Sequence, residues 1–510
     1  MDKFYLTTAI PYANASPHIG TAIDYLLGDV ILRYQKQRGY KVLLSIGTDE
    51  HGSKVEKKAE SLGLSPQAFV DKLQPEFQKM RQALNLNFGA PIDQVHQPLK
   101  FQSLDQQSIV NVRTSDPGHV SRVQAIWQKL DQAGVIYKDS YEGWYCSGCE
   151  AFITETEAHD MDYICADHKK PLERLKEENY YLKVSKFTSQ IKEFIKSSVI
   201  PEFRGRELLG LIEDEAKDVS ISRPKSKLTW GVPVPGDDSQ VMYVWVDALS
   251  NYLTALNYPD DDWHKDYWPA QIEIVGKDIL RFHAIIWPAM LLALGLELPK
   301  KLLVHGFINV NGAKMSKSLG NVVSPVDIID RYGADAFRYY FTSHVPTFDD
   351  GDFTFAKFNE AYNNELANDY GNLISRVSAM IRKYLAGDLS GLNEINEMSD
   401  ATETLDSMYK VSMNGLDLNT AITACFKYIR SLNQYIERMA PWQVNKLDDA
   451  KEKADRLQAI FSTLVNDIKH VNYYLAPFLP DTSSKVEDIF KGGYIAKNTP
   501  ILFPKIELGE

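Results

Sequence analysis

The sequence predicts an α/β protein built on a doubly wound parallel sheet and followed by an all-α helical bundle. Two stretches of alternating strand and helix patterns predict the sheet, one in the first 60 residues and one from about residue 241 to 307. Residues 118–224 lie between these two stretches. They have a different distribution of turn residues and contain a cysteine cluster, which indicates an insertion that splits the sheet. After residue 353, Gly and Pro become sparse and apolar residues recur at helical spacing, which predicts the bundle.

The first strand–helix–strand unit lies at the start of the chain. Residues 4–10 form an apolar run typical of a buried strand. Residues 20–38 have an amphipathic pattern that Gly39 ends, which predicts a helix. Residues 41–46 are again strand-like. A helix between two strands predicts that the strands are parallel.

The same alternation returns in the second half of the sheet. Its expected elements are a strand at 241–246, a helix from Asp247, a strand at 271–275, a helix from Asp278 and a strand at 301–307. The insertion is expected to hold a helix at 119–132 and aromatic strands around 141–145. The predicted domains are residues 1–117 (first half of the sheet domain), 118–224 (insertion), 225–325 (second half), 326–352 (connector) and 353–510 (helical bundle).

Composition excludes several classes of protein. A chain of 510 residues with 44% hydrophobic and 24% charged residues is neither a single small module nor a disordered or fibrous protein. The formal net charge of −12 means that a polyanionic partner must be held by local basic patches. The longest apolar stretch, residues 284–296, contains Pro288 and is too short to cross a bilayer. Since the N-terminus also lacks signal-peptide or transit-peptide character, a cytoplasmic protein without a membrane partner is expected.

Residues 7–21 predict an anion site. A strand ends, a Pro-rich loop follows at the carboxyl edge of the sheet, and a helix begins at Gly20. The free N–H groups and the dipole of a helix N-terminus favour an anion there. His18 would then face a phosphate. Taken alone, this segment also fits an ordinary loop with a solvated histidine.

A second segment, residues 311–321, predicts contacts with a polyphosphate. Lys314, Ser316, Lys317 and Ser318 follow a strand and are flanked by glycines. Cations and hydroxyl donors in such a loop stabilise the charge that develops when a phosphoryl or nucleotidyl group is transferred. A solvated surface loop is the alternative for this segment on its own.

The cysteines predict a metal site. Cys146 and Cys149 have C-x2-C spacing, and Cys165 and His168 have C-x2-H spacing after fifteen further residues. Three thiolates and one imidazole can complete a tetrahedral structural zinc site with no open position. Reduced thiols on a cytosolic surface are the alternative. Cys425 lies in an apolar helical pattern and is expected in the core.

Together, the two loop segments resemble the class I aminoacyl-tRNA synthetases. His18-Ile19-Gly20-Thr21 is similar to their HIGH signature, and residues 314–318 read KMSKS letter for letter. The resemblance implies a split Rossmann-type sheet whose loops bind ATP with Mg²⁺ and stabilise the α-phosphorus during attack by an amino-acid carboxylate. It implies the catalytic residues His18, Gly20, Thr21, Lys314, Ser316 and Lys317. Thr21 departs from the usual histidine, and its hydroxyl can donate to a phosphate but cannot carry charge.

Further segments resemble the methionyl-tRNA synthetase family, over essentially the whole chain. They are Ala9-Ile10-Pro11-Tyr12, Gly47-Thr48-Asp49-Glu50-His51-Gly52, the cysteine pairs, Tyr243-Val244-Trp245-Val246-Asp247-Ala248, Gly276-Lys277-Asp278-Ile279 with His283, and Ala440-Pro441-Trp442. The resemblance implies a methionine pocket lined by Ile10, Tyr12, Trp245, Tyr252, Ile279 and His283. It also implies that Asp49 accepts the substrate ammonium and Asp278 holds the ribose of ATP. Individually, Tyr252 and Ile279 also fit core positions, His283 a satisfied helix histidine and Trp245 a sheet position, whereas Asp49 lies in a glycine-flanked turn at the carboxyl end of a strand, where ligands bind.

The resemblance extends to substrates and partners. Aromatic residues suit a polarisable thioether, but an apolar pocket discriminates weakly between chains that differ by one methylene, so homocysteine is an expected competitor. Asn372, Arg376 and Trp442 match the family's anticodon-reading positions in the helical region. A tryptophan can stack on a splayed base while polar groups read base edges. Because the chain ends soon after the bundle, without the dimerising domain of some relatives, a monomer is expected.

The resemblance therefore implies a methionine–tRNA ligase. Such an enzyme converts L-methionine and ATP to methionyl-adenylate and pyrophosphate, then transfers methionyl to the 3′ end of initiator and elongator tRNA(Met). Three alternatives remain: another class I synthetase, a non-catalytic tRNA-binding protein descended from a synthetase, and a zinc hydrolase. The isoleucine, leucine and valine enzymes usually need a larger insertion, the cysteine enzyme holds its metal in the substrate pocket, and a hydrolase needs an open metal position.

Overall fold

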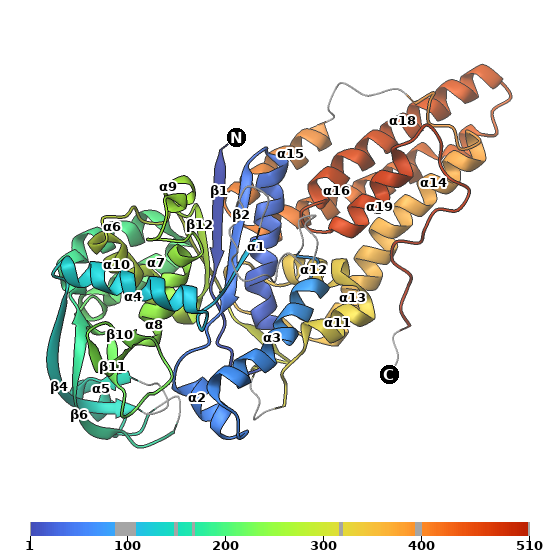
Figure 1. Ribbon diagram of the computed structural model, residues 1–510. Coiled ribbons are helices and arrows are strands. Elements are labelled where there is room, and N and C mark those ends of the chain that lie inside the picture. Colours follow the sequence, from blue (N-terminus) through green and yellow to red (C-terminus); the bar gives the residue numbers. More distant parts are fainter. Residues whose placement is uncertain are drawn as a thin grey trace.

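The computed structural model describes residues 2–86, 109–146, 151–165, 169–315, 320–392 and 400–507. Its centre is a six-stranded sheet with the strand order β3-β2-β1-β12-β13-β7, and every neighbouring pair in it is parallel (Figure 1). The strands are β1 (Lys3–Thr8), β2 (Lys41–Thr48), β3 (Ile109–Arg113), β7 (Val199–Ile200), β12 (Ile272–Gly276) and β13 (Leu302–His305). The predicted parallel sheet is confirmed.

Helices cover both faces of this sheet because its strands carry apolar side chains on both faces. On one face lies α1 (Ile19–Gln37), whose buried residues belong to the same hydrophobic core as the C-terminal helices. On the other face, α4 (Pro117–Gln132), α8 (Val244–Thr254) and α10 (Trp287–Ala293) form a second core with Tyr5, Leu43 and Val275. The fold is therefore doubly wound, as predicted.

The strand order reverses direction at β1. Leu6 of β1 lies opposite Leu44 of β2 on one side and opposite Ile272 of β12 on the other. The chain leaves β1 through α1 toward β2, and returns to the other side of β1 only at Ile272, where β12 begins. Open α/β sheets bind ligands at the carboxyl ends of the strands beside such a switch point. This geometry places the loops after β1 and β12 together.

The region predicted as an insertion, residues 118–224, contributes to three sheets, the third through β9 (Ser222–Pro224). An antiparallel sheet in the order β5-β4-β6-β8 consists of β4 (Ile136–Cys146), β5 (Ala151–Ile153), β6 (Glu173–Leu182) and β8 (Val219–Ser220). The short strand β7 instead pairs with β13 at the edge of the central sheet. Three helices accompany these strands: α5 (Glu155–Asp160), α6 (Thr188–Ser198) and α7 (Glu202–Glu215). In Figure 1, β4 and β6 lie on the opposite side of the central sheet from the C-terminal helices.

One predicted strand is wrong in part. Residues 241–246 were expected to form one strand of the parallel sheet, but strand β11 (Asp237–Met242) ends before Tyr243 and α8 begins at Val244. In addition, β11 pairs antiparallel with β9 (Ser222–Pro224) and β10 (Pro233–Val234) in a separate sheet. A short apolar run fits a buried strand and a buried helix equally well, so its pattern does not decide between them.

The C-terminal region is helical from residue 355, which confirms the predicted all-α region. A small sheet consists of β14 (Ile308–Val310), β15 (Ala313–Lys314) and β16 (Gly351–Phe353); the chain forms two helices between β15 and β16, and further packed helices follow β16. They are α11 (Pro325–Tyr332), α12 (Ala334–Ser343), α13 (Phe355–Ala361), α14 (Asn372–Tyr384), α15 (Asp400–Asn414), α16 (Leu418–Met439), α17 (Pro441–Val444), α18 (Ala450–Leu475) and α19 (Pro480–Phe490). The remaining helices of the sheet domain are α2 (Ser53–Glu60), α3 (Pro66–Ala83) and α9 (Trp263–Tyr267).

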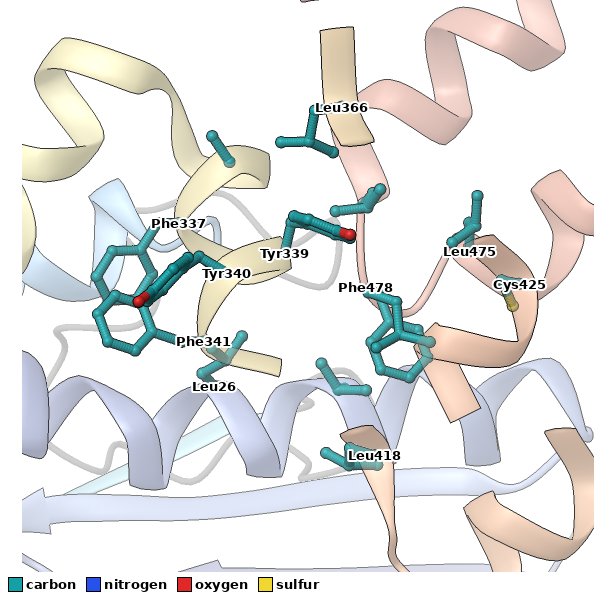
Figure 2. Close-up of a cluster of buried hydrophobic side chains, with 14 of the residues drawn as sticks. Leu26, Phe337, Tyr339, Tyr340, Phe341, Leu366, Leu418, Cys425, Leu475 and Phe478 are labelled. Atoms are coloured by element: carbon teal, nitrogen blue, oxygen red, sulfur yellow. The ribbon is translucent and has the colours of Figure 1, made fainter. Parts of the chain in front are cut away.

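An aromatic core joins the bundle to the sheet domain. Figure 2 shows Phe337, Tyr340 and Phe341 on one side of α12, with Leu26 of α1 near Phe341, and Tyr339 on the other side, pointing toward Phe478 and the C-terminal helices. Cys425 is fully buried in the same cluster, as its position in the sequence predicted. Within the residues that the structure describes, no helix combines the length and apolar character that crossing a membrane requires.

Candidate active site

A cavity of about 400 Å³ opens where the loops after β1, β2, β12 and β13 meet. It lies at the switch point of the sheet, where ligands are expected. The structure brings twelve of the predicted site residues together as its lining: Ile10, Tyr12, His18, Gly20, Thr21, Asp49, Trp245, Tyr252, Asp278, Ile279, His283 and Lys314. The predicted residues Ser316 and Lys317 lie outside the described part of the chain.

His18 is the N-cap of α1, and its hydrogen bond defines its tautomer. The backbone N–H of Thr21 donates to Nδ1 of His18 at 3.3 Å, and the hydroxyl of Thr21 accepts from the backbone N–H of His18. Because a backbone N–H can only donate, Nδ1 is an acceptor, and the neutral ring then carries its proton on Nε2. His18 therefore carries an N–H donor on Nε2, the ring nitrogen that does not take part in the cap. Thr21 closes this capping box, a role that the sequence did not reveal.

The position of the His18 ring requires glycine at residue 20. A Cβ atom at residue 20 would lie 2.9 Å from Cε1 of His18, closer than carbon atoms pack. Only glycine lets the imidazole lie over the first turn of α1. The close approach gives a steric reason for the glycine in this signature.

Asp49 is held by the backbone of the loop that follows β1. Its N–H donates to the carbonyl of Pro11 at 2.9 Å, and its carbonyl accepts from the N–H of Ala13 at 2.8 Å. The side chain is 3% exposed. These contacts fix a carboxyl group in the wall of the cavity, beside Tyr12.

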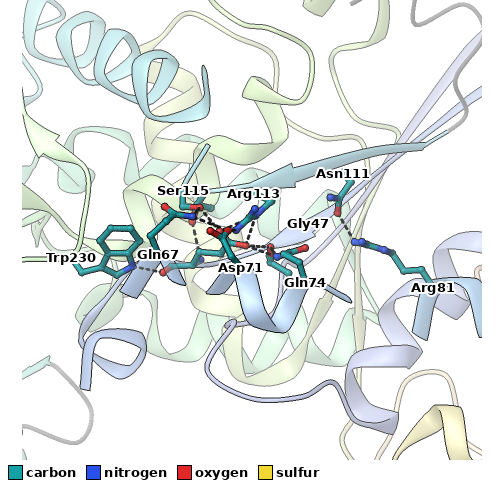
Figure 3. Close-up of polar contacts among 12 residues, drawn as sticks. Gly47, Gln67, Asp71, Gln74, Arg81, Asn111, Arg113, Ser115 and Trp230 are labelled. Carbon is teal, nitrogen blue, oxygen red and sulfur yellow. Dashed lines mark hydrogen bonds and ion pairs between the residues drawn. The ribbon is translucent and has the colours of Figure 1, made fainter. Parts of the chain in front are cut away.

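A buried polar network holds the residue next to Asp49. The Glu50 carboxylate accepts from Nε of Arg113 at 2.9 Å, from Thr48 at 2.8 Å and from Ser115. Arg113 also contacts Asp71, as Figure 3 shows. A buried carboxylate with several donors is stabilised and rigid. The network therefore immobilises the turn that carries Asp49.

The next residue in this turn, His51, is held by Asp247 of α8. Nδ1 of His51 lies 2.7 Å from Oδ2 of Asp247, and Nε2 of His119 lies 2.9 Å from Oδ1 of the same carboxyl group. Burial alone would raise the pKa of Asp247, but the two histidines lower it to about 2. Asp247 thus remains a carboxylate and connects the turn after β2 with α4 and α8.

Aromatic rings form one wall of the cavity. Trp245 stacks on Phe282 with ring centroids 3.9 Å apart and planes 8° from parallel. The edges of Trp245 meet Tyr12 at 6.4 Å and His283 at 6.0 Å in T-shaped contacts. Such a wall offers polarisable surface and no formal charge.

The polar pair at the back of this wall is neutral. Nδ1 of His283 donates to the carbonyl of Ile279 at 3.0 Å, so Nε2 accepts from the hydroxyl of Tyr252 at 2.8 Å. Burial lowers the pKa of His283 to about 4, and burial raises the pKa of Tyr252 well above its usual value. At neutral pH this part of the cavity therefore holds an uncharged, hydrogen-bonded pair that suits an apolar ligand group.

The prediction from sequence missed several residues that line the cavity. Asp24 of α1 and His305 at the end of β13 form an ion pair of 2.9 Å. Burial acts to lower the pKa of His305, but the carboxylate of Asp24 outweighs burial and the pKa is raised. The Nζ atom of Lys314 lies 4.7 Å from the ring centroid of Phe307. The signal for His305 and Phe307 was their place at the carboxyl end of a predicted strand, where ligand-binding residues gather.

A buried carboxyl group lies behind the pocket. Glu273 of β12 is fully buried, and its Oε1 accepts from Nε1 of Trp287 at 3.0 Å. Within the described residues, its Oε2 has no hydrogen-bond partner. Burial raises the pKa of Glu273 to about 8. Trp287 in turn packs against Tyr252, with ring centroids 5.8 Å apart, so Glu273 supports the wall that carries the neutral pair.

We expect Glu273→Gln to remove a pH dependence of stability. Between the ordinary value of 4.5 and about 8, the unfolded chain releases this proton while the folded chain keeps it. The free energy of unfolding therefore falls by about 1.4 kcal/mol for each pH unit in that window. The amide cannot ionise and still accepts from Trp287. The melting temperature of Glu273→Gln should therefore rise above that of the natural protein as pH increases from 5 to 8.5.

Thermal melts across that pH range test the expectation. Glu360→Gln, at an exposed position of α13, is the matched control and should follow the natural protein at every pH. If the natural protein and Glu273→Gln lose stability in parallel between pH 5 and 8.5, the buried carboxyl does not keep its proton in the folded state.

Comparison with known proteins identifies the family. A family model described as tRNA synthetases class I (M) matches residues 4–170 and 159–378. The methionine–tRNA ligase of Streptomyces coelicolor is 40% identical over 500 residues, covering 95% of this chain and 89% of that protein. That of Clostridium acetobutylicum is 39% identical over 495 residues, covering 95% and 73%. The chain belongs to the methionine–tRNA ligase family.

Solved structures of this family share the whole fold. The Mycobacterium tuberculosis methionyl-tRNA synthetase in complex with methionyl-adenylate superimposes with a TM-score of 0.87 at 31% identity, covering 99% of this chain and all of that one. The apo form of the same protein has a TM-score of 0.80. As a family member, this protein is a ligase that forms aminoacyl-tRNA.

Two of the four predicted zinc ligands lie in the described residues. Cys146 at the end of β4 and Cys165 are both buried, in one small cluster with Ala158 and Leu172. The other two, Cys149 and His168, lie outside the described residues. Among the residues that are described, no group of three or more metal-ligating side chains occurs, so the zinc site stays a prediction.

The predicted anticodon residues lie on neighbouring helices of the bundle. Asn372 is exposed on α14, and Arg376, one turn further, pairs with Glu437 of α16 at 2.6 Å. Trp442 follows α16 in the short helix α17 and is partly buried against the bundle core. The ion pair connects α14 to the end of α16 that leads to Trp442.

Proposed function

We propose that the cavity activates L-methionine with ATP. A carboxylate oxygen of methionine attacks the α-phosphorus, a bond to that oxygen forms, and the bond to the bridging oxygen of pyrophosphate breaks. The products are methionyl-adenylate and pyrophosphate. The observation that carries this proposal is the meeting of a neutral aromatic pocket with His18, Asp278 and Lys314 in one cavity.

Methionine is assigned to the aromatic end of the cavity. Asp49 accepts its ammonium, and the side chain packs among Tyr12, Trp245 and His283, with Ile10, Tyr252 and Ile279 completing the wall. A thioether packs well against aromatic rings. Because the Tyr252–His283 pair is neutral, a charged side chain would lose hydration there without gaining a partner. Homocysteine differs by one methylene and is the expected competitor.

ATP is assigned to the other end. Asp278, directly after β12, holds the ribose, and the Nε2–H of His18 donates to a phosphate oxygen at the N-terminus of α1. Lys314, Ser316 and Lys317 surround the phosphates, and Thr21 adds a hydroxyl. Mg²⁺ accompanies ATP and neutralises part of the phosphate charge. The Nε2–H of His18 is a fixed neutral donor, so it can stabilise the charge that develops on the phosphate without having to reorganise.

The second step transfers methionyl to the 3′ end of tRNA(Met), both initiator and elongator. A ribose hydroxyl oxygen bonds to the carbonyl carbon, the bond from that carbon to the phosphate oxygen breaks, and AMP leaves with the electron pair. The hydroxyl proton passes to solvent or to the leaving phosphate. Asn372, Arg376 and Trp442 read the anticodon by stacking and base-edge contacts. The assigned form is a cytoplasmic monomer.

The insertion is assigned a structural zinc ion held by Cys146, Cys149, Cys165 and His168. The buried, neighbouring thiols of Cys146 and Cys165 suit such a site. We expect Cys165→Ser to lower bound zinc from about one equivalent toward zero and to lower the melting temperature, because structural zinc contributes folding free energy. Cys425→Ala is the control: it should lower the melting temperature and leave the zinc content unchanged. Unchanged zinc and unchanged melting in Cys165→Ser would exclude the site.

Amino-acid-dependent ATP–pyrophosphate exchange tests the proposed function. We expect exchange with methionine and, more weakly, with homocysteine, among the twenty amino acids and homocysteine. Lys317→Ala should abolish it. Exchange with a different amino acid would overturn the assigned pocket. Folded protein that binds tRNA but supports no exchange would instead support the non-catalytic alternative, with Thr21 as the suspected cause.

A further inference from the structure

Two carboxylates at one short strand contact the hairpin that carries Lys314. The hairpin consists of β14 and β15, and its turn is formed by Asn311 and Gly312, which both have positive φ angles, of 52° and 74°. A turn of this kind matches the twist of two antiparallel strands. On its other side, β14 pairs parallel with β16, which contains Asp352 and directly follows Asp350. None of the assigned contacts to methionine or ATP uses these two carboxylates.

Each carboxylate accepts a hydrogen bond from one end of β14. Oδ1 of Asp350 accepts from the backbone N–H of Phe307 at 2.9 Å, and Oδ1 of Asp352 accepts from that of Gly312 at 2.7 Å. The N–H of Gly312 lowers the pKa of Asp352 below its usual value. Nζ of Lys357 lies 3.2 Å from Oδ2 of the same carboxylate. Because hydrogen bonds to an ionised acceptor are stronger than neutral ones, both ends of β14 are firmly held.

Asp350 also connects the hairpin with the loop after β12. Nζ of Lys277, the residue before Asp278, lies 2.7 Å from Oδ1 of Asp350. Burial alone would raise the pKa of Asp350, but Lys277 and the N–H of Phe307 lower it. The ring centroid of Phe307 lies 4.6 Å from Nζ of Lys277 and 4.7 Å from Nζ of Lys314. One carboxylate therefore joins the loop of Asp278 to the strand that leads to Lys314.

The backbone of this segment packs directly on the end of β13. A Cβ atom at residue 306 would overlap the backbone carbonyl of Asp349 and lie 2.5 Å from the backbone nitrogen of Asp350. Gly306 therefore permits the close approach. The N–H of Gly351 donates to the carbonyl of Phe307 at 2.8 Å. Since the contact is between two backbones, the position of the carboxylates is passed to the hairpin without a flexible side chain in between.

We propose that Asp350 and Asp352 are positioning residues for the activation step: they hold the hairpin so that Lys314 meets the phosphates of ATP while Asp278 holds the ribose. This assignment rests on the proposed function, because it assumes that Lys314 contacts ATP. A lysine side chain is long and flexible, so the place of its backbone limits where its ammonium can reach. A fixed backbone lowers the entropy lost when the ammonium meets the phosphates.

Exchange kinetics of two variants of Asp352 test the assignment. In Asp352→Ala, the N–H of Gly312 loses its acceptor. We expect kcat/KM for ATP to fall about tenfold, the lower end of what a hydrogen bond to a charged group contributes, while KM for methionine changes by less than about twofold. Asp352→Asn keeps a side-chain oxygen for this N–H and should stay within about threefold of the natural value. An unchanged kcat/KM for ATP in Asp352→Ala, or equal losses in the two variants, would overturn the assignment.

Asp388→Ala is the matched control. Oδ1 of Asp388 also accepts from a backbone N–H, that of Ser390 at 2.8 Å, but Asp388 follows α14 and does not line the cavity. Its exchange kinetics should equal those of the natural protein within about 1.5-fold. Similar losses in Asp388→Ala and Asp352→Ala would mean that the effect of Asp352 is not specific to the hairpin, which also overturns the assignment.

A double variant shows whether Asp352 acts through Lys314. If it does, adding Asp352→Ala to Lys314→Ala should lower kcat/KM for ATP by about threefold or less, instead of about tenfold. If the two factors multiply fully, Asp352 acts independently of Lys314 and the assignment is wrong. Exchange by the natural protein distinguishes the two proposals: its absence contradicts the proposed function, whereas normal exchange that Asp352→Ala does not slow contradicts only the positioning role.

Discussion

Methionine-dependent ATP–pyrophosphate exchange should be slower by about two to three orders of magnitude in His18→Ala. Nδ1 of His18 is occupied by the N–H of Thr21, so the ring presents its Nε2–H to the cavity as a fixed donor. Removing one such preorganised donor costs about 10²–10³ in rate in other enzymes. The KM for ATP should change far less than kcat, because the donor acts mainly on the charge that develops during attack. Steady-state exchange at several ATP concentrations measures both.

Two further variants separate catalysis from helix capping. His18→Asn keeps a side-chain acceptor for the N–H of Thr21 and is a good N-cap, so it should retain stability and still lose most of the activity. Thr21→Ser keeps the hydroxyl of the capping box and should stay within about threefold of the natural rate. If His18→Asn is nearly fully active, His18 caps α1 and does not assist the reaction.

Replacing Arg338 should have the largest effect on stability. Arg338 of α12 is fully buried: Nη2 lies 2.5 Å from Asp29 of α1, and its other donors reach the carbonyls of Leu84, Pro477 and Phe478. In Arg338→Met, Asp29 keeps only Arg33 as an ion-pair partner, and three buried carbonyls lose a donor. Breaking a buried pair in this way costs about 3–5 kcal/mol. The melting temperature should fall by roughly 5 °C or more.

The matched control uses an ion pair at the surface. Arg206 of α7 pairs with Glu202 at 2.6 Å, and both side chains are more than 60% exposed. Arg206→Met should leave the melting temperature nearly unchanged, because exposed pairs contribute little. The double variant Asp29→Leu/Arg338→Met should recover part of the loss, since it removes the fully buried carboxylate, while Arg33 is partly exposed and keeps its contact with the Asn85 carbonyl. Equal, small shifts in Arg338→Met and Arg206→Met would contradict the assigned role of Arg338 in joining the sheet domain to the bundle.

The spacing of apolar residues along the chain was enough to predict the architecture. The run at residues 4–10, the amphipathic stretch at 20–38 and the strand at 41–46 correspond to β1, α1 and β2 within a few residues. The helical region beyond residue 353 was equally clear. Residues 241–246 were the exception, because an apolar run of this length fits both a strand and a helix, and packing against β9 and β10 decided where the strand ends.

The sequence by itself determined which chemistry-bearing segments the protein has. His18 and Gly20 before a helix, Lys314 after a strand, and Asp49 in a glycine-flanked turn each carry a signal within about ten residues, and the rule for open sheets predicted that such loops meet. The parallel sheet does bring these residues to one cavity.

Only the tertiary structure decided the state and the surroundings of those groups. The hydrogen bond from Tyr252 to His283, the charge of Asp247 and the retained proton of Glu273 depend on contacts with, or burial by, elements far apart in the chain. The cavity likewise exists only because the loops after β1, β2, β12 and β13 converge. The physical reason is that hydration and neighbouring charge set a pKa, and that packing sets a cavity, so both are properties of contacts that no local stretch of sequence contains.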